Sequence, residues 1–72
     1  MKKAFKLEEL DCAHCAAKME DAINKIPGVN KATINFMAQK LVIDAEDGKM
    51  DEVVRLAQAA ISKVEPDCVI VK

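Results

Sequence analysis

Aromatic residues are almost absent from this 72-residue chain, which has two phenylalanines and no tryptophan or tyrosine. Proteins that bind single-stranded nucleic acids stack the bases on aromatic side chains, and two rings do not supply such a platform. Basic residues are not in excess either, because 11 Lys and Arg stand against 12 Asp and Glu, for a net charge of −1. No positive field attracts a phosphate backbone or an anionic membrane, so nucleic-acid binding is excluded.

Long hydrophobic runs are also absent. The longest apolar stretches, such as residues 68–71, are only a few residues long, whereas a membrane-spanning helix needs roughly 20. The charged residues 1–6 are followed by no apolar segment, so no secretory signal is predicted. We therefore expect a soluble chain in the cytoplasm.

Cysteine is scarce, and its three copies are Cys12, Cys15 and Cys68. Three cysteines are too few, and odd in number, for the disulfide framework of a small secreted domain. Free thiols or metal ligands are the better interpretation. The length allows one domain, residues 1–72, with a small core.

Apolar residues change their period along the chain, and a period of two predicts strands while a period near 3.6 predicts helices. The predicted strands are residues 2–8, 31–36, 41–45 and 68–71. The predicted helices are residues 15–26, which end at Pro27 and Gly28, and residues 50–63. Met19 and Met37 fall at helix and strand positions typical of core residues.

The order β-α-β-β-α-β predicts an α+β, ferredoxin-like fold, in which a four-stranded antiparallel sheet carries both helices on one face. In this topology the last strand lies antiparallel beside the first. Residues 9–15 and residues 64–68 should therefore be neighbours in space.

The segment most informative about chemistry is Asp-Cys-Ala-His-Cys at residues 11–15, where the first strand gives way to the first helix. Two thiols three residues apart in such a turn, Cys12 and Cys15, can both bind one ion. The partial positive charge and free N–H groups of a helix N-terminus favour the thiolate, which is the form that binds metal.

Each neighbour of these thiols has two interpretations. Asp11 is either a third ligand or a helix N-cap, a role that Asp fills well. His14 lies between the cysteines, at a position that we expect to face solvent. Cys68 is either a small core residue or, because of its predicted closeness to the loop, a further ligand.

The sequence resembles the heavy-metal-associated domain family over essentially the whole chain. This family includes copper chaperones, mercury-binding proteins and N-terminal domains of heavy-metal-transporting P-type ATPases. The family loop usually reads Gly-Met-Thr-Cys-x-x-Cys, and residues 9–15 of this chain match it. Glu9 replaces the glycine, Leu10 replaces the methionine that packs beneath the loop, and Asp11 replaces the threonine.

The Asp-Cys-x-x-Cys variant resembles the branch of the family that belongs to zinc-, cadmium- and lead-transporting ATPases. Two thiolates satisfy Cu(I), whereas Zn(II) and Cd(II) prefer four ligands and Zn(II) accepts carboxylate oxygen beside sulfur. Asp11 therefore suits a divalent ion, and Cu(I) is the less favoured cargo. The resemblance also implies a carboxylate near the last strand as a further ligand, for which Glu65 is the candidate.

The resemblance implies a non-catalytic cytosolic domain that binds Zn, Cd or Pb through Cys12, Cys15, Asp11 and Glu65 and regulates or feeds a metal-exporting ATPase. The ATP-driven pump chemistry lies outside these residues. The implied partners are the transporter's membrane domain or a second metal-binding domain. At high protein concentration we also expect a dimer bridged by metal.

Three other functions compete with this one. A free-standing copper or mercury chaperone of the same fold is expected to carry threonine or serine at position 11 and a basic residue at position 65. A thiol-disulfide oxidoreductase is expected to have a longer βαβ unit with aromatic flanks. A structural zinc site would need His14 and the adjacent Cys15 to reach one tetrahedral ion together with Cys12, which is difficult.

Overall fold

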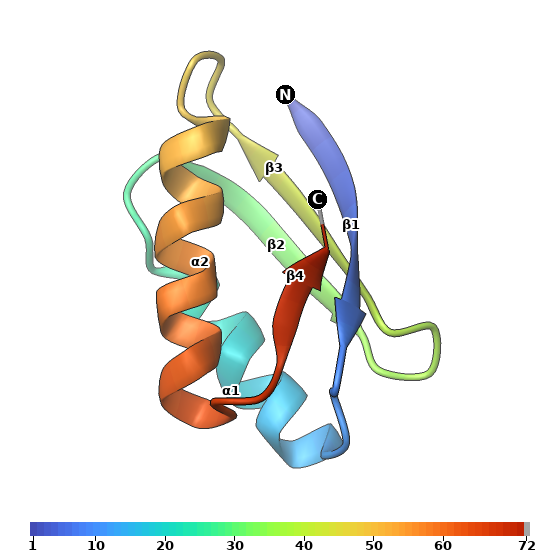
Figure 1. The fold of residues 1–72 in the computed structure, drawn as a ribbon. Coiled ribbons are helices and arrows are strands. Elements are labelled where there is room, and N and C mark those ends of the chain that lie inside the picture. Colours follow the sequence, from blue (N-terminus) through green and yellow to red (C-terminus); the bar gives the residue numbers. More distant parts are fainter. Residues whose placement is uncertain (72) are drawn as a thin grey trace.

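The structure, a computed structural model, describes residues 1–71 and has the order β-α-β-β-α-β (Figure 1). The strands are β1 (Lys2–Glu8), β2 (Val29–Asn35), β3 (Lys40–Ala45) and β4 (Val69–Val71). The helices are α1 (Ala13–Asn24) and α2 (Met50–Val64). The predicted α+β, ferredoxin-like fold class is therefore confirmed.

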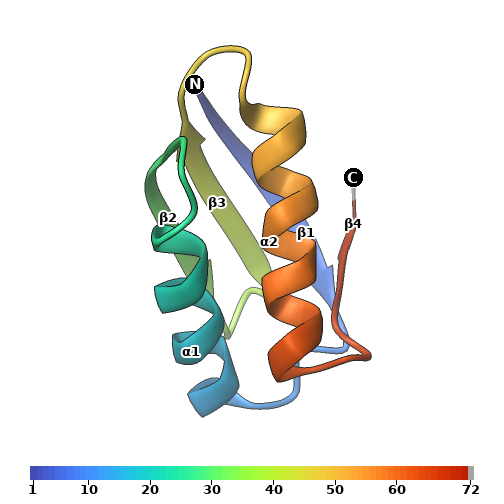
Figure 2. The same ribbon diagram turned by 90° about the vertical axis from the view of Figure 1, so that its left-hand side faces the viewer.

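The four strands form one antiparallel sheet in the order β2-β3-β1-β4, and both helices cover the same face of it (Figure 2). The last strand pairs with the first over a short register, in which Lys6 lies opposite Val71 and Glu8 opposite Val69. This pairing brings the segment after β1 beside the segment before β4, as the topology predicts. Among residues 1–71, no helix has the length and apolar character needed to cross a membrane.

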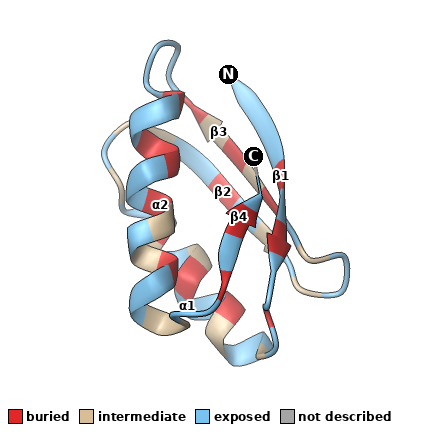
Figure 3. Cartoon of the chain, viewed as in Figure 1, coloured by how far each residue is buried: buried red, intermediate tan, exposed pale blue. Residues whose placement is uncertain are grey.

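The hydrophobic core lies between the helices and the sheet, and every element contributes buried residues to it (Figure 3). In β1 the buried residues are Phe5 and Leu7, which alternate with exposed ones as expected for a half-buried strand. Helix α1 buries Ala16, Met19 and Ile23, at steps of three and four residues. Amphipathic packing of this kind, rather than intrinsic propensity, stabilises helices this short.

The prediction that Met37 is a core residue is wrong. Met19 is fully buried, but the side chain of Met37 is 89% exposed. Residues 36–39 form the turn between β2 and β3, so Met37 lies past the end of the strand that would have carried it into the core. In α2, Leu56 is 38% exposed and lies outside the core.

Candidate metal centre

Cys12 is the N-cap of α1. Its backbone is extended, with φ −132° and ψ 115°, and its Sγ accepts a hydrogen bond from the backbone N–H of Cys15 at 3.2 Å. The first N–H groups of a helix have no partner within the helix, so a capping side chain stabilises this end. The alternative in which Asp11 caps the helix is therefore wrong, and the carboxylate of Asp11 is exposed instead.

The two thiols of the loop affect each other's pKa in opposite directions. The Cys15 S–H donates to the Cys12 sulfur, which lowers the pKa of Cys12, and the backbone N–H of Cys15 lowers it further. The same hydrogen bond raises the pKa of Cys15 to about 11, because ionisation of Cys15 would break it. The first proton therefore leaves the pair from Cys12, and the second is held by Cys15 until a cation replaces it.

Negative charge from the neighbouring loop acts on both thiols. Glu65 raises the pKa of Cys12 and of Cys15, while Lys18 lowers the pKa of Cys15. A divalent ion between these groups would neutralise charges that otherwise repel each other.

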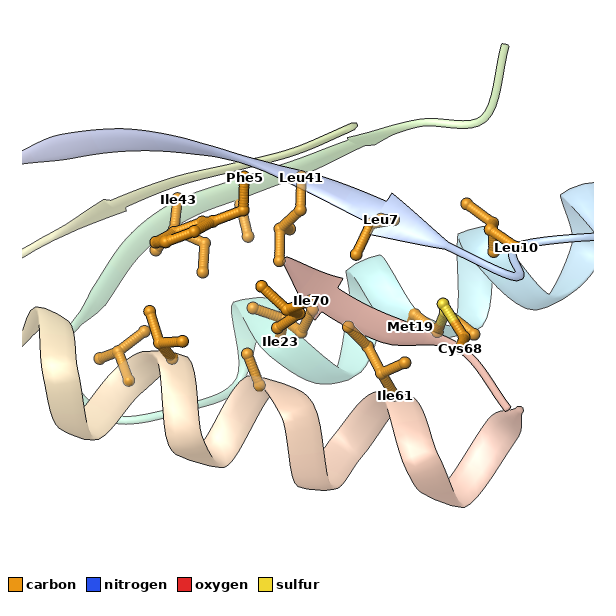
Figure 4. Packing of buried hydrophobic residues seen from close by; sticks show 14 of the residues in the cluster. Phe5, Leu7, Leu10, Met19, Ile23, Leu41, Ile43, Ile61, Cys68 and Ile70 are labelled. Atoms are coloured by element: carbon orange, nitrogen blue, oxygen red, sulfur yellow. The ribbon is translucent and has the colours of Figure 1, made fainter. Parts of the chain in front are cut away.

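Buried residues form the floor beneath the loop, and Figure 4 shows Leu10, Met19 and Cys68 at this end of the core. Leu10 is 1% exposed, so the residue in place of the family's usual methionine also packs under the loop. Cys68 is fully buried, and burial raises the pKa of its thiol, with smaller effects from the charges of Glu65, Asp11 and Glu9. Cys68 is therefore a core residue whose thiol has a pKa above its ordinary value.

Gln39 also positions the loop, and it has no signal in the sequence. Its side chain pairs with the backbone of Leu10, because Oε1 accepts from the Leu10 N–H at 3.3 Å and Nε2 donates to the Leu10 carbonyl at 2.5 Å. Its own carbonyl accepts from the N–H of Leu7 at 2.7 Å. A polar residue in a turn gives no indication that it contacts a segment 29 positions away.

Glu9 has a left-handed backbone, with φ 65°, at the position where the family usually has glycine. Residues with a Cβ rarely adopt this conformation, whereas glycine adopts it at little cost. Glu9 therefore adopts a backbone conformation that glycine, the usual residue at this position in the family, would adopt at lower cost.

The two predicted carboxylate ligands, Asp11 and Glu65, line the same surface hollow. Its volume is about 260 Å³, and its lining residues are Glu9, Asp11, Val64, Glu65, Pro66 and Asp67. The prediction that these two loops are neighbours is thereby confirmed. His14, which we expected to face solvent, is exposed.

The predicted ligands are close together but not assembled. Within residues 1–71, no three His, Cys, Asp or Glu side chains converge closely enough to hold a metal ion. The structure brings together the two sulfurs, and it brings Asp11 and Glu65 to the rim of the same hollow. A metal that used all four would have to draw both carboxylates inward from the surface.

The fold and the paired thiols define a metal-binding domain, and comparison with known proteins gives its family. Residues 4–66 match the family described as the heavy-metal-associated domain, and the chain belongs to this family. The family fold binds metal and is generally non-catalytic.

Relatives come from two groups of proteins. The chain is 37% identical over 57 residues to a zinc/cadmium/lead-transporting P-type ATPase of Shigella sonnei, a match that covers 79% of this chain and 8% of that ATPase. It is 30% identical over 50 residues to the copper chaperone CopZ of Enterococcus hirae, which covers 69% of this chain and 72% of the chaperone. The chain thus spans less than a tenth of the length of the ATPase.

Among solved structures, the N-terminal domain of ZntA in its Zn(II) form is similar, with a TM-score of 0.69 and 30% identity. That match covers 96% of this chain and 86% of the ZntA domain. The chain is therefore a heavy-metal-binding domain related both to ATPase domains and to chaperones.

Proposed function

We propose that this domain binds one Zn(II), Cd(II) or Pb(II) ion as cargo through Cys12, Cys15 and Asp11, with Glu65 as a further ligand. It delivers this ion to a metal-exporting P-type ATPase, or regulates that ATPase, from the cytoplasmic side. The metal is cargo and not a resident cofactor, and the domain itself catalyses no reaction.

The observation that carries the proposal is the exposed carboxylate of Asp11 directly before a hydrogen-bonded pair of thiols. Because Cys12 caps the helix, Asp11 has no capping role to explain its presence. Two thiolates and one carboxylate together carry a charge of −3, which a +2 ion offsets better than a +1 ion does. Zn(II) takes sulfur and oxygen ligands together in four-coordinate sites, whereas soft thiolates alone select Cu(I).

The position of the site supports transfer by ligand exchange. Cys12 and Cys15 are only half-buried, and the hollow between Asp11 and Glu65 is open to solvent. An incoming donor group from a partner can therefore reach the ion before the first ligands leave. Such ligand exchange needs no catalytic base.

The second candidate function is that of a free-standing copper or mercury chaperone. The observation in its favour is the match to 72% of the length of a copper chaperone. The carboxylates at positions 11 and 65 are what distinguish the two candidates, because they add anionic oxygen that Cu(I) does not need.

The test is an anaerobic titration of the reduced protein with Cd(II), followed by thiolate-to-metal charge-transfer absorption, and by competition against Zn(II) and Cu(I). We expect one Cd(II) per chain, and loss of the absorption in the double variant Cys12→Ala, Cys15→Ala. Cys68→Ala is the matched control, which should keep the absorption because Cys68 is a buried thiol. Cd(II) binding that survives the double variant would contradict the assignment of the thiols.

The second carboxylate is tested by Glu65→Gln, with Asp67→Asn as the control from the same hollow. We expect Glu65→Gln to weaken Zn(II) and Cd(II) by about tenfold or more, since even groups outside the ligand set typically contribute 10- to 100-fold. Asp67→Asn should change the affinity little. Equal effects of the two substitutions would show only a general loss of negative charge and would remove Glu65 from the ligand set.

A further inference from the structure

The segment that carries Glu65 connects the end of α2 to the beginning of β4 (Figure 2). The N–H of Glu65 donates to the carbonyl of Ile61 at 2.8 Å, which continues the hydrogen bonding of the helix. The carbonyl of Glu65 accepts from the N–H of Cys68 at 3.1 Å, which closes a turn over residues 65–68. Both backbone groups of Glu65 are therefore paired, one with the helix and one with the residue before β4.

Pro66 is the second residue of this turn. The proline ring holds φ at roughly −65°, which is the value that the second position of a common β-turn requires. The side chain of Pro66 is exposed, so its contribution to the turn comes from the backbone and not from packing. Proline thus restricts the conformations open to the chain directly after Glu65.

Gln58 of α2 holds the other end of the turn. Its Nε2 donates to the carbonyl of Cys68 at 3.1 Å and to Oγ of Ser62 at 3.2 Å. Its Oε1 accepts from the N–H of Ile70 at 2.8 Å. A carbonyl and the N–H two residues later point to the same side of a strand, so the amide binds β4 where a neighbouring strand would bind it. These three hydrogen bonds fix the orientation of the amide.

A continuous series of hydrogen bonds connects Gln58 to Glu65. The Gln58 amide binds the carbonyl of Cys68, and the N–H of Cys68 binds the carbonyl of Glu65. The side chain of Cys68 is fully buried and lies beside Met19 in Figure 4. Without the amide, the Cys68 carbonyl and the Ile70 N–H would lose their partner, and the turn would lose its support from α2.

The turn brings Glu65 to the thiol loop. Glu65 is half-buried and lines the same hollow as Asp11. Its negative charge also raises the pKa of Cys12, Cys15 and Cys68, so its charge acts across the gap between the two loops. A ligand whose position is set before the ion arrives loses less conformational freedom on binding, so a loosened turn would lower metal affinity.

We propose that Gln58 is a positioning residue of the divalent-metal site, because it holds the turn that places Glu65 beside the thiols. This inference rests on the proposed role of Glu65 as a ligand. Gln58 then contributes to ion selectivity through Glu65. It affects Zn(II) and Cd(II), which use the carboxylate, and does not affect Cu(I), which two thiolates satisfy.

The test is a double-mutant cycle of Gln58→Met and Glu65→Gln, measured as the affinities of the reduced protein for Zn(II), Cd(II) and Cu(I). Methionine keeps the approximate size of glutamine and removes its hydrogen bonds. We expect Gln58→Met to weaken Zn(II) and Cd(II) by about tenfold, at the lower end of the effect of groups that hold a metal ligand, and to leave Cu(I) unchanged. In the Glu65→Gln background, Gln58→Met should change the affinities by less than about twofold, the error of such cycles.

The matched control is Asn24→Leu, at the opposite edge of the sheet. The Asn24 amide accepts from the N–H of Ala32 at 2.8 Å and donates to its carbonyl at 2.9 Å, and β2 is the edge strand farthest from β4. This variant should lose stability and keep its metal affinities. Hydrogen exchange of the metal-free protein gives a second readout, because Gln58→Met should speed the exchange of the Cys68 and Ile70 amides.

Pro66→Ala tests the turn without removing a hydrogen bond. Alanine samples more backbone conformations than proline does. This variant should also weaken Zn(II) and Cd(II), and only while Glu65 is present. It decides the question if Gln58→Met does not fold.

The results separate failure of the ligand from failure of the positioning. Unchanged Zn(II) and Cd(II) affinities in Glu65→Gln would reject the proposed ligand set, and the role of Gln58 with it. Weaker binding in Glu65→Gln, combined with an undiminished effect of Gln58→Met in that background, would keep the ligand and overturn the positioning role. Full Zn(II) and Cd(II) affinity in Gln58→Met, equal weakening by Asn24→Leu, or an equal loss of Cu(I) affinity would overturn it as well.

Discussion

The side chain of Gln39 pairs with both backbone groups of Leu10, accepting from its N–H and donating to its carbonyl. The turn between β2 and β3 thereby holds the segment that leads into the two thiols, and Leu10 itself is fixed in the core below. The position of the metal loop thus depends on a residue that contacts no metal.

Removing this side chain should loosen the loop. Gln39→Ala is expected to cost about 1 to 2 kcal/mol of stability, because two hydrogen bonds are lost, and to lower Cd(II) affinity by several-fold. The matched control is Asn24→Ala, which removes a similar pair of bonds at Ala32, far from the thiols. Urea denaturation should show similar losses in both variants, and Cd(II) affinity should fall only in Gln39→Ala. Equal Cd(II) affinity in Gln39→Ala and Asn24→Ala would contradict the conclusion that Gln39 positions the metal loop.

Glu9→Gly should stabilise the domain. Glycine adopts the left-handed φ of 65° without strain, so we expect a gain of about 1 kcal/mol. The control is Glu8→Gly, one residue earlier in β1 and paired with Val69, which should destabilise by roughly 0.5 to 1 kcal/mol. Thermal or urea unfolding of both variants measures the difference. Destabilisation by Glu9→Gly would show that the backbone at this position is not strained.

Metal affinity should increase with pH. Between the lowered pKa of Cys12 and the pKa of Cys15 near 11, Cys12 is ionised and the incoming metal displaces one proton from Cys15. The apparent affinity for Cd(II) should then rise about tenfold for each pH unit, and more steeply below the pKa of Cys12, where two protons are displaced. Competition titrations from pH 6 to 8.5 measure this slope.

Thiol alkylation provides the control for that assignment. Iodoacetamide should modify Cys12 first, and Cys68 only after unfolding, because its thiol is buried. Cys15→Ala should raise the pH at which Cys12 reacts, since it removes the main hydrogen bond that lowers the pKa of Cys12. Faster reaction of Cys15 than of Cys12, or an affinity independent of pH, would contradict the lowered pKa of Cys12 and the raised pKa of Cys15.

Met19 and Met37 were both predicted to be core residues, but replacing them should change the free energy of unfolding by very different amounts. Met19→Ala removes a fully buried side chain and should cost about 2 to 5 kcal/mol. Met37→Ala changes a side chain that is 89% exposed and should stay within about 0.5 kcal/mol. Denaturant unfolding gives both values, and a cost above 1 kcal/mol for Met37→Ala would place that residue in a contact the structure does not show.

Local pattern predicted most of the fold because each element has a clear apolar period. Strand β1 occupies residues 2–8 as predicted, and β4 pairs with it antiparallel. Helix α1 begins at Ala13, not at residue 15, because the Cys12 sulfur caps it, and amphipathic spacing does not reveal caps. Strand β2 begins at Val29, before the regular alternation, where the pairing with β3 is irregular.

The site was less accessible to sequence reasoning. The spacing of Cys12 and Cys15 predicted that the two thiols lie together, and the topology predicted that the two loops meet. The support from Gln39 was not predicted, because it depends on a contact between residues 29 positions apart. Cys12 caps the helix in place of Asp11, because its backbone is extended and its sulfur accepts a hydrogen bond from the N–H of Cys15. Asp11 is exposed and Glu65 is half-buried, and the fold holds neither carboxylate against the thiols, so residue spacing gave no indication of their distance from the sulfurs.

The central claim, that Asp11 selects a divalent ion, is tested most directly by the affinities of Asp11→Asn for Zn(II), Cd(II) and Cu(I), with Glu9→Gln as the control from the same hollow. Asparagine keeps the shape of the side chain and removes its charge. We predict that Zn(II) and Cd(II) weaken by about tenfold or more, that Cu(I) affinity barely changes, and that Glu9→Gln leaves all three nearly unaltered. Unchanged Zn(II) and Cd(II) affinities in Asp11→Asn would contradict the claim and raise the copper chaperone to equal standing.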